Sequence, residues 1–308
     1  MNSQDQRTRK MFEVTGTWTA IVTPFGEGRE PEVDYDTLDA IVDDQIKAGI
    51  DGIVACGTTG ESPTLSHEEQ DRVIERVVRR AAGRVSVVAG TGSNCTAEAL
   101  RLTKRAAESG ADAAMIVCPY YNRPSQRMLA EHFAALAEGH TLPIVIYNIP
   151  IRTGVNIEPD TVAALRRRFP RVIVGIKEAS GSLDNAMRLR AVSDIKVLCG
   201  DDALTLPMMS VGATGVVSVA SNVVPRIIST LVNSVNAGDF AAARPIHERL
   251  QPLLRALFQE PNPVPVKCGL RLLGRGNGNV RAPLLPALPE TEAALRGALG
   301  TLGVLPAK

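Results

Sequence analysis

Lys177 is the residue whose position points most directly to chemistry. It closes the apolar run Val172–Lys177, and the 308-residue sequence contains only seven lysines. An amine at the end of a buried strand is partly desolvated, which disfavours its charged form and leaves more neutral amine to attack a carbonyl. Lys177 is therefore a candidate for Schiff-base formation. The alternative is a lysine that extends to solvent or pairs with Glu178.

Tyr147 lies near the end of a second predicted strand, Ile144–Asn148, and Arg152 follows that strand. A phenol beside an imine can transfer protons to and from carbon, although core packing alone also explains a tyrosine here. Arg152 begins a short loop that ends at Gly154. Its guanidinium could hold a carboxylate through two hydrogen bonds, or it could be an ordinary surface arginine.

A glycine-flanked turn, Gly57-Thr-Thr-Gly60, follows another apolar run. Gly57 and Gly60 would let backbone N–H groups approach an anion, and Thr58 and Thr59 would add hydroxyl donors. The turn lacks the G-K-[ST] ending of a phosphate-binding loop, so a small carboxylate fits it better than a nucleotide. A plain connecting turn is the alternative.

Other familiar sites are not indicated by the sequence. The segment Gly90-Thr-Gly-Ser-Asn-Cys95 ends in cysteine and does not match a dinucleotide-binding fingerprint. No G-x-S-x-G elbow for a nucleophilic serine occurs. The histidines have no metal-ligand spacing, so no metal is expected. They are His67, His132, His140 and His247.

The composition is that of an ordinary globular protein with a small-molecule partner. Hydrophobic residues make up 44%, and 34 Lys and Arg nearly balance 33 Asp and Glu, which argues against nucleic-acid binding. No signal peptide or stretch of about 18 apolar residues occurs, so no membrane association and a cytoplasmic location are expected. The widely spaced cysteines are expected to be buried, reduced thiols. They are Cys56, Cys95, Cys118, Cys199 and Cys268.

Eight short apolar runs alternate with longer segments of helical periodicity, which predicts βα units and a parallel sheet. The expected strands are Thr17–Thr23, Gly52–Cys56, Val85–Gly90, Ala113–Val117, Ile144–Asn148, Val172–Lys177, Lys196–Cys199 and Gly215–Val219. The expected helices between them are Asp36–Ala48, His67–Ala82, Thr96–Ser109, Gln126–Glu138, Pro159–Phe169, Leu183–Val192 and Pro225–Asn236. Ser66 and Glu69 form a capping box before the second helix.

This alternation predicts an α/β fold, a (β/α)8 TIM barrel over residues 14–237. Residues 238–308 then form a C-terminal helical extension, with helices near Phe240–Phe258, Val264–Leu273 and Thr291–Gly300. The prolines in segment 260–266 separate the first two of these helices. In such a barrel, chemistry is expected where the strands end.

Five motifs, each at a predicted strand end, resemble the dihydrodipicolinate synthase/N-acetylneuraminate lyase superfamily. The resemblance covers roughly residues 14–273. The motifs are Gly57-Thr-Thr-Gly-Glu61, Pro119-Tyr-Tyr-Asn122, Tyr147-Asn-Ile-Pro150, Gly175-Ile-Lys-Glu178 and Gly200-Asp-Asp202. Within the superfamily the resemblance is to the synthases, which implies a lyase that condenses pyruvate with L-aspartate 4-semialdehyde in lysine and diaminopimelate biosynthesis. It implies no cofactor.

The resemblance also implies roles for single residues. Lys177 would form the pyruvate imine and Tyr147 would relay protons, while Thr58 would link Tyr147 by hydrogen bonds to Tyr121. Tyr121 would reach into the neighbouring subunit's site. The substrate-binding residues would be Thr59, Arg152, Val217 and Gly200, with Thr59 and the backbone near Val217 on the pyruvate carboxylate and Arg152 on the semialdehyde carboxylate.

Alternatives within the superfamily remain open, because the Schiff-base residues are shared and specificity lies in loops. Sialic-acid lyases resemble the chain at Lys177 and Tyr147, but they show Gly-Ser-Thr-Gly-Glu at the first loop and lack an arginine at position 152. Another pyruvate-dependent aldolase or lyase, or a 2-keto acid dehydratase, is the second hypothesis. A non-catalytic barrel that binds a metabolite is the third.

Members of the superfamily are usually homotetramers, dimers of dimers, and some are inhibited by lysine at a cleft between subunits. Residues that match this cleft are Ser62, His67, Asn94, Glu98 and Tyr120. Gln70 departs from it, standing where lysine-sensitive enterobacterial members carry a histidine, and Pro63 departs as well. These departures argue against feedback inhibition.

Overall fold

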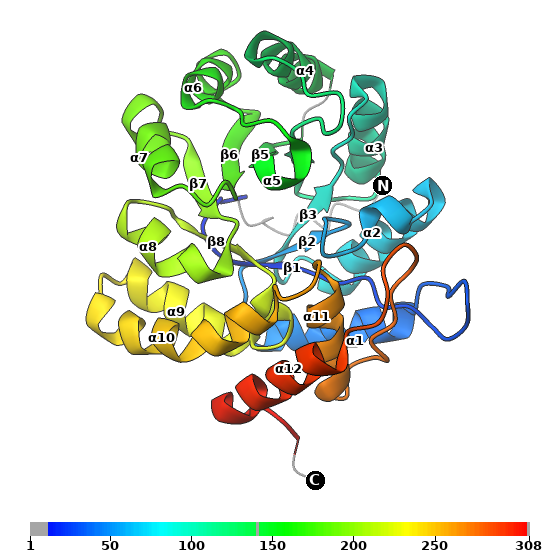
Figure 1. The fold of residues 1–308 in the computed structure, drawn as a ribbon. Helices are drawn as coiled ribbons and strands as arrows, with labels where there is room; N and C mark the ends of the chain where they lie inside the picture. The colour runs from blue at the N-terminus through cyan, green and yellow to red at the C-terminus, as the bar shows by residue number, and fades with distance from the viewer. Residues whose placement is uncertain (1–11, 140–141, 307–308) are drawn as a thin grey trace, which may run out of the picture.

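The eight strands close into a parallel barrel. In a computed structural model, which describes residues 12–139 and 142–306, each strand pairs with the next one along the chain and β8 pairs with β1. The strands are β1 (Gly16–Ala20), β2 (Gly52–Ala55), β3 (Ser86–Gly90), β4 (Ala113–Val117), β5 (Ile144–Asn148), β6 (Ile173–Glu178), β7 (Lys196–Cys199) and β8 (Gly215–Ser218). Figure 1 looks down the barrel, with the helices forming an outer ring. The predicted (β/α)8 fold is confirmed.

β1 ends earlier than its apolar pattern predicts. Beyond Ala20, the amide of Val22 donates to Asn222 Oδ1 (3.2 Å) instead of to a neighbouring strand. The Thr23 hydroxyl donates to Gly60 O (2.7 Å). The last residues of the predicted strand therefore hold the Gly57–Gly60 turn in place through this hydrogen bond.

Seven helices between the strands lie where their periodicity predicts them. They are α1 (Tyr35–Lys47), α2 (His67–Ala81), α3 (Thr96–Glu108), α4 (Gln126–Gly139), α6 (Pro159–Arg168), α7 (Leu183–Val192) and α9 (Pro225–Asn236). The capping box before α2 is confirmed, because Ser66 Oγ accepts from the Glu69 amide and the Glu69 carboxylate accepts from the Ser66 amide.

The sequence pattern did not predict the shortest helices. These are α5 (Pro150–Thr153), α8 (Thr205–Ser210) and the 3-10 turns η1 (Ser62–Thr64), η2 (Asp202–Leu204) and η3 (Ala220–Asn222). Three to six residues are too few to show a helical period. Most of them follow strand ends, and Figure 1 shows α5 in front of the barrel. They therefore shape the end where chemistry is expected.

Three further helices form the predicted C-terminal extension. They are α10 (Phe240–Ala256), α11 (Val264–Leu272) and α12 (Pro289–Leu302). α10 packs against α9 and α12, while α11 contacts α12 and η3. Across the described ranges, no helix combines the length and the apolar character needed to cross a bilayer.

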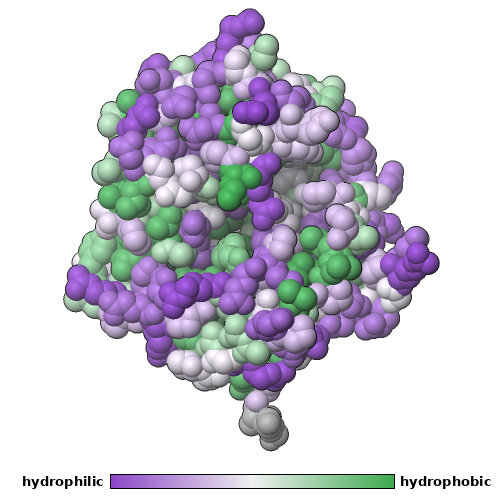
Figure 2. All heavy atoms as spheres, viewed as in Figure 1, coloured by the Kyte–Doolittle hydropathy of each residue, from purple (hydrophilic) through white to green (hydrophobic). Residues whose placement is uncertain are grey.

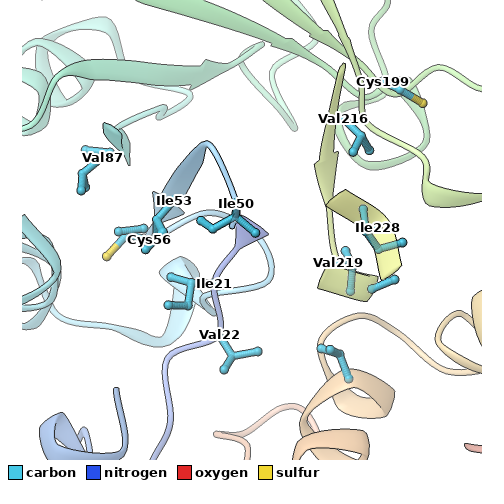
Figure 3. Packing of buried hydrophobic residues seen from close by; sticks show 14 of the residues in the cluster. Ile21, Val22, Ile50, Ile53, Cys56, Val87, Cys199, Val216, Val219 and Ile228 are labelled. Atoms are coloured by element: carbon cyan, nitrogen blue, oxygen red, sulfur yellow. The ribbon is translucent and has the colours of Figure 1, made fainter. Parts of the chain in front are cut away.

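Two hydrophobic clusters stabilise the barrel. The larger one lies between the strands and the surrounding helices, and Figure 3 shows part of it, with Ile53, Val87 and Val216 from the strand region and Ile228 from α9. The smaller one comes from side chains on the other face of the strands. Its buried members are Val14, Trp18, Ala20, Val54, Val88, Ala113, Met115, Val145, Tyr147, Ile149, Leu198 and Val217. Tyr147 is thus held by packing on the face that carries the site.

The cysteines follow the prediction with one exception. All five thiols are free, and four of them are buried. Burial raises the pKa of Cys118 to about 12. Cys95 is exposed, so the prediction that it is buried is wrong. It stands at the N-cap of α3, outside the packed face of that helix.

Candidate active site

Lys177 and Tyr147 lie beside each other near the ends of β6 and β5. The two residues are paired in register, and both side chains are buried, with exposed fractions of 6% and 5%. The Nζ atom of Lys177 lies 4.1 Å from the centroid of the Tyr147 ring. An imine formed on this amine would lie beside the Tyr147 ring, so the phenol is the neighbouring group that could exchange protons with it.

Glu178 does not pair with Lys177, because successive residues of a strand face opposite sides of the sheet. The Glu178 carboxylate accepts hydrogen bonds from Asn148 Nδ2 (3.0 Å), Asn185 Nδ2 (2.7 Å) and the Ser180 amide (2.7 Å). No carboxylate of the described residues lies within 4.0 Å of Lys177 Nζ. The alternative in which Lys177 extends to solvent or pairs with Glu178 is therefore wrong.

The Gly57–Gly60 turn is closed by its own backbone. The Gly60 amide donates to Gly57 O (3.1 Å) and the Glu61 amide donates to Thr58 O (3.1 Å). The Gly60 amide is therefore not one of the N–H groups that an anion could reach. Within the described chain, the amides of Thr58 and Thr59 donate to no other group. These two amides and the threonine hydroxyls remain as donors for a small carboxylate.

Thr59 is oriented by a residue that the sequence analysis did not identify. Its hydroxyl oxygen is buried and accepts a hydrogen bond from Asn262 Nδ2 (3.0 Å). Because Asn262 is the donor, the hydroxyl proton of Thr59 stays available to a ligand. Asn262 belongs to the proline-containing segment 260–266, and its contact lies 203 residues away in sequence. No local pattern signals such a contact.

Gly200 follows β7 and makes room for the lysine side chain. A Cβ atom at this position would lie 3.0 Å from Lys177 Cε and 2.6 Å from Ala179 Cβ. Both distances are shorter than an ordinary van der Waals contact. The glycine at this predicted site position is therefore explained by the packing of Lys177.

Asp202 fixes the backbone that follows Val217, a buried residue of β8. Its carboxylate accepts from the amides of Val219 (2.8 Å) and Ala220 (3.2 Å) and from the Ser218 hydroxyl. Burial raises the pKa of Asp202. Although Asp202 belongs to a motif noted in the sequence, its link between the ends of β7 and β8 was not predicted.

Two residues of the predicted site, Tyr121 and Arg152, are exposed. The Tyr121 side chain is 90% exposed, and its backbone has a φ of 71°, which is costly for a residue other than glycine. Arg152 lies in α5 and has no acidic partner among the described residues. No hydrogen bond joins Tyr121 to Thr58 or Tyr147 in the described chain. A single copy therefore does not complete the predicted series of hydroxyl groups.

A cavity of about 340 Å³ lies between part of this site and the predicted regulatory residues, and Lys177 and Thr59 do not line it. Thr58, Tyr147 and Arg152 contribute to its wall. Four of the five predicted regulatory residues line the same cavity, namely Ser62, His67, Glu98 and Tyr120. Asn94 does not line it. Figure 2 shows this face of the molecule, which is hollowed near its centre.

Interactions within the chain already engage several groups of the regulatory part. His67 Nε2 lies 3.0 Å from Glu98 Oε1. The Ser93 hydroxyl donates to Glu98, and this bond together with His67 lowers the pKa of Glu98. Gln70, the residue that departs from the family pattern, is buried and donates through Nε2 to Ser62 O (2.9 Å). The side-chain amide of Gln70 is thus held against η1.

The histidines do not gather at a common point. His132 Nδ1 lies 2.8 Å from Thr96 Oγ1, and His247 Nε2 lies 3.0 Å from Gln251 Nε2. His140 lies outside the described residues. In the described ranges, no group of three or more His, Cys, Asp or Glu side chains is placed to hold a metal ion.

Comparison with known proteins identifies the family. A sequence model of the dihydrodipicolinate synthetase family matches residues 13–301. A 4-hydroxy-tetrahydrodipicolinate synthase from Methanothrix thermoacetophila is 52% identical over 287 residues, which cover 92% of this chain and 95% of that protein.

Solved structures agree with this assignment. The crystal structure of dihydrodipicolinate synthase from Aquifex aeolicus matches with a TM-score of 0.92 and 46% identity, covering 96% of this chain and 100% of that one. The enzyme from Acinetobacter baumannii, solved in complex with pyruvate, matches with a TM-score of 0.92 and 39% identity over 95% of this chain and all of that one (100%). The barrel, the order of the strand-end motifs and these matches lead to one conclusion: the chain belongs to the dihydrodipicolinate synthetase family.

Proposed function

We propose that this protein, a relative of 4-hydroxy-tetrahydrodipicolinate synthases, condenses pyruvate with L-aspartate 4-semialdehyde in lysine and diaminopimelate biosynthesis. The observation that carries the proposal is the pairing of Lys177 with Tyr147. The amine is buried, has no carboxylate partner among the described residues and lies 4.1 Å from the centre of the phenol ring. These are the properties expected of an imine-forming lysine with an adjacent proton carrier.

The first half of the reaction takes place on pyruvate. The neutral Lys177 amine attacks the C2 carbonyl, and loss of water gives an imine. Loss of a proton from C3 then gives an enamine, whose C3 atom attacks the aldehyde carbon of the semialdehyde. Tyr147 would carry protons during these steps.

The second half frees the enzyme. The α-amine of the bound semialdehyde unit displaces Lys177 from the imine carbon, which closes a ring and restores the lysine amine. The water lost in the first half is the only small molecule released. No electrons are gained or lost overall, so the reaction balances without a redox cofactor.

The two substrate carboxylates would be held by different groups. The free amides of Thr58 and Thr59, the Thr59 hydroxyl and the backbone after Val217 would hold the pyruvate carboxylate. The guanidinium of Arg152, which is unpaired within the described ranges, would hold the semialdehyde carboxylate through two charge-assisted hydrogen bonds. Gly200 would keep the space around Lys177 open.

The active unit would be a dimer within a homotetramer. Tyr121 is exposed in the single chain and could reach Thr58 of a second copy, which would complete a proton relay from Tyr147 to solvent. The same contact between copies would enclose the cleft that Tyr120 lines. Because Gln70 is uncharged and already bonded to Ser62 O, we infer that lysine does not inhibit strongly at this cleft.

A comparison of substrates tests the proposed function. Wild-type protein is incubated with pyruvate and L-aspartate 4-semialdehyde, and product formation is followed in a coupled assay. The same preparation is tested for cleavage of N-acetylneuraminate, with Lys177→Ala as the inactive control. We expect condensation and no cleavage. Cleavage without condensation would instead support a lyase, and absence of both reactions would support a binding protein.

A further inference from the structure

A buried ion pair lies directly behind the Thr58–Thr59 turn. Lys267 of α11 pairs with Glu61, the residue that follows the turn, and their side chains are only 3% and 1% exposed. In each of the other ion pairs between described residues, at least one side chain is more than 15% exposed. Burying two charges is costly, and replacing such a pair with apolar residues is often neutral or stabilising. Stability alone therefore gives a weak reason for this pair.

Several groups hold the two charges in a single geometry. Lys267 Nζ donates to Asn279 O (2.9 Å) and lies 3.9 Å from the centroid of the Phe25 ring. The second oxygen of Glu61 accepts from the Arg281 amide (3.1 Å). Burial lowers the pKa of Lys267 to about 8 against the opposing effect of Glu61. The pair is thus part of a network that joins the turn to the chain after α11.

Glu61 transmits this constraint to the turn. Its own backbone is left-handed, with a φ of 53°, and its amide donates to Thr58 O (3.1 Å). A left-handed conformation at a glutamate persists only where the surroundings hold it. Asn262, five residues before Lys267, donates to Thr59 Oγ1 (3.0 Å). One segment of the C-terminal extension therefore contacts the turn at two successive points.

We propose that Glu61 and Lys267 are positioning residues for the condensation. Lys267 lies in the C-terminal extension, and its ion pair with Glu61 would keep the Thr58–Thr59 turn in the geometry that binds the pyruvate carboxylate. This inference rests on the proposed function and assigns α11 a part in it. It predicts that loss of the pair raises KM for pyruvate more than KM for the semialdehyde. Arg152, the residue proposed to bind the semialdehyde, lies on a different element, α5.

Steady-state kinetics of charge-removing variants test the proposal. Lys267→Met, Glu61→Gln and the double variant are compared with wild type, and the fraction of competent sites is measured by borohydride trapping with pyruvate. We expect Lys267→Met to raise KM for pyruvate by about tenfold or more and to lower kcat, while KM for the semialdehyde changes by less than about threefold. The double variant should recover part of the loss, because it leaves no unpaired charge.

Two matched controls separate positioning from general destabilisation. Arg271→Met removes another charge of α11, breaking its 2.6 Å ion pair with Glu292 without touching the turn. Val266→Ala removes buried volume next to Lys267 while keeping the pair. Both should leave KM for pyruvate within about twofold of wild type even where they lower the melting temperature.

The outcomes distinguish this inference from the proposed function. Wild-type kinetic constants in folded Lys267→Met and Glu61→Gln would overturn the positioning role while leaving the condensation intact. An equal rise of KM in Val266→Ala would overturn it as well. If Lys267→Met does not accumulate as folded protein, Glu61→Gln carries the test alone. If wild-type protein forms no borohydride-trapped pyruvate adduct and shows no condensation, the proposed function itself is wrong.

Discussion

Lys177 is buried and has no acidic partner in the described part of the chain, and this combination sets it apart from an ordinary lysine. Glu178, its neighbour in sequence, is engaged on the other face of β6 by Asn148 and Asn185. The amine is left against the Tyr147 ring. The Lys177 amine therefore stays available to bind a substrate.

Arg152 gives the first prediction. Because its guanidinium is exposed and unpaired among the described residues, Arg152→Ala should not disturb the fold. Loss of a bidentate, charge-assisted contact should raise KM for the semialdehyde by roughly 10- to 100-fold. KM for pyruvate should stay within about threefold.

The control for this variant is Arg127→Ala, which removes another exposed arginine, one that does not line the cavity. Its kinetic constants should match those of wild type. Equal effects of Arg152→Ala on both substrates, or no effect on either, would contradict the role given to Arg152. The measurement is a pair of saturation curves, one for each substrate.

The sequence allowed Lys177 and Tyr147 to be singled out because each lies at the end of an apolar run. It could not reveal Asn262 or Lys267, because their partners lie about 200 residues earlier in the chain. It also could not show that the Gly60 amide is already bonded. Such contacts depend on tertiary structure, and no local period or motif reports them.

At the scale of elements, the strands and long helices were predictable because alternation and a 3.6-residue period repeat along them. β6 and α2 are examples. The four-residue α5 and six-residue α8 were not predictable, since their conformation is set by the barrel end on which they lie. β1 was predicted too long, because apolar residues continue past Ala20 into a segment that bonds to Asn222.

The packing of α4 against α3 gives a prediction on pH. His132 of α4 is 6% exposed, and burial lowers its pKa from 6.5 to about 4. Between these values the unfolded chain binds more protons than the folded chain, so the free energy of unfolding falls as the pH falls from 6.5 to 4. The shift corresponds to roughly 3 kcal/mol at full extent.

Chemical denaturation of wild type and His132→Gln across this pH range checks the prediction. The variant should be less sensitive to acid, whatever its stability at pH 7, because glutamine does not titrate. The Nε2 atom of His132 has no hydrogen-bond partner among the described residues. No hydrogen bond to that atom therefore offsets the stability lost when His132 is protonated. Parallel pH dependences in the two proteins would show that His132 does not contribute.

At the scale of the whole molecule, the exposed Tyr121 would need a second copy of the chain to act in catalysis. If Tyr121 acts in the neighbouring site, an equal mixture of Lys177→Ala and Tyr121→Ala subunits should regain activity when the chains assemble together. Half of randomly formed dimers are hybrids with one complete site, so recovery should approach about one quarter of wild type.

Each variant assembled alone is the control and should be nearly inactive. The mixture should gain nothing if Tyr121 acts within its own chain, since no site then contains both residues. Sedimentation or light scattering on the same samples reports whether dimers or tetramers form. Activity without any subunit exchange would contradict the shared site.

The C-terminal extension is joined to the barrel at the site rather than only at its periphery. Asn262 and Lys267 contact the turn that follows β2, and Arg275 pairs with Asp44 of α1 (3.0 Å). The division of the chain at residue 237 stays a prediction. These contacts favour a barrel and extension that act together.

Every proposed step of the reaction depends on a covalent imine at Lys177, which borohydride reduction makes detectable by mass. Wild type, Lys177→Ala and Lys196→Ala, an exposed lysine of β7, are treated with pyruvate and borohydride, and the intact masses and digested peptides are measured. We expect one reduced pyruvate group per chain, attached to Lys177, in wild type and in Lys196→Ala. We expect none in Lys177→Ala. No adduct in wild type, or an adduct that persists in Lys177→Ala, would contradict it.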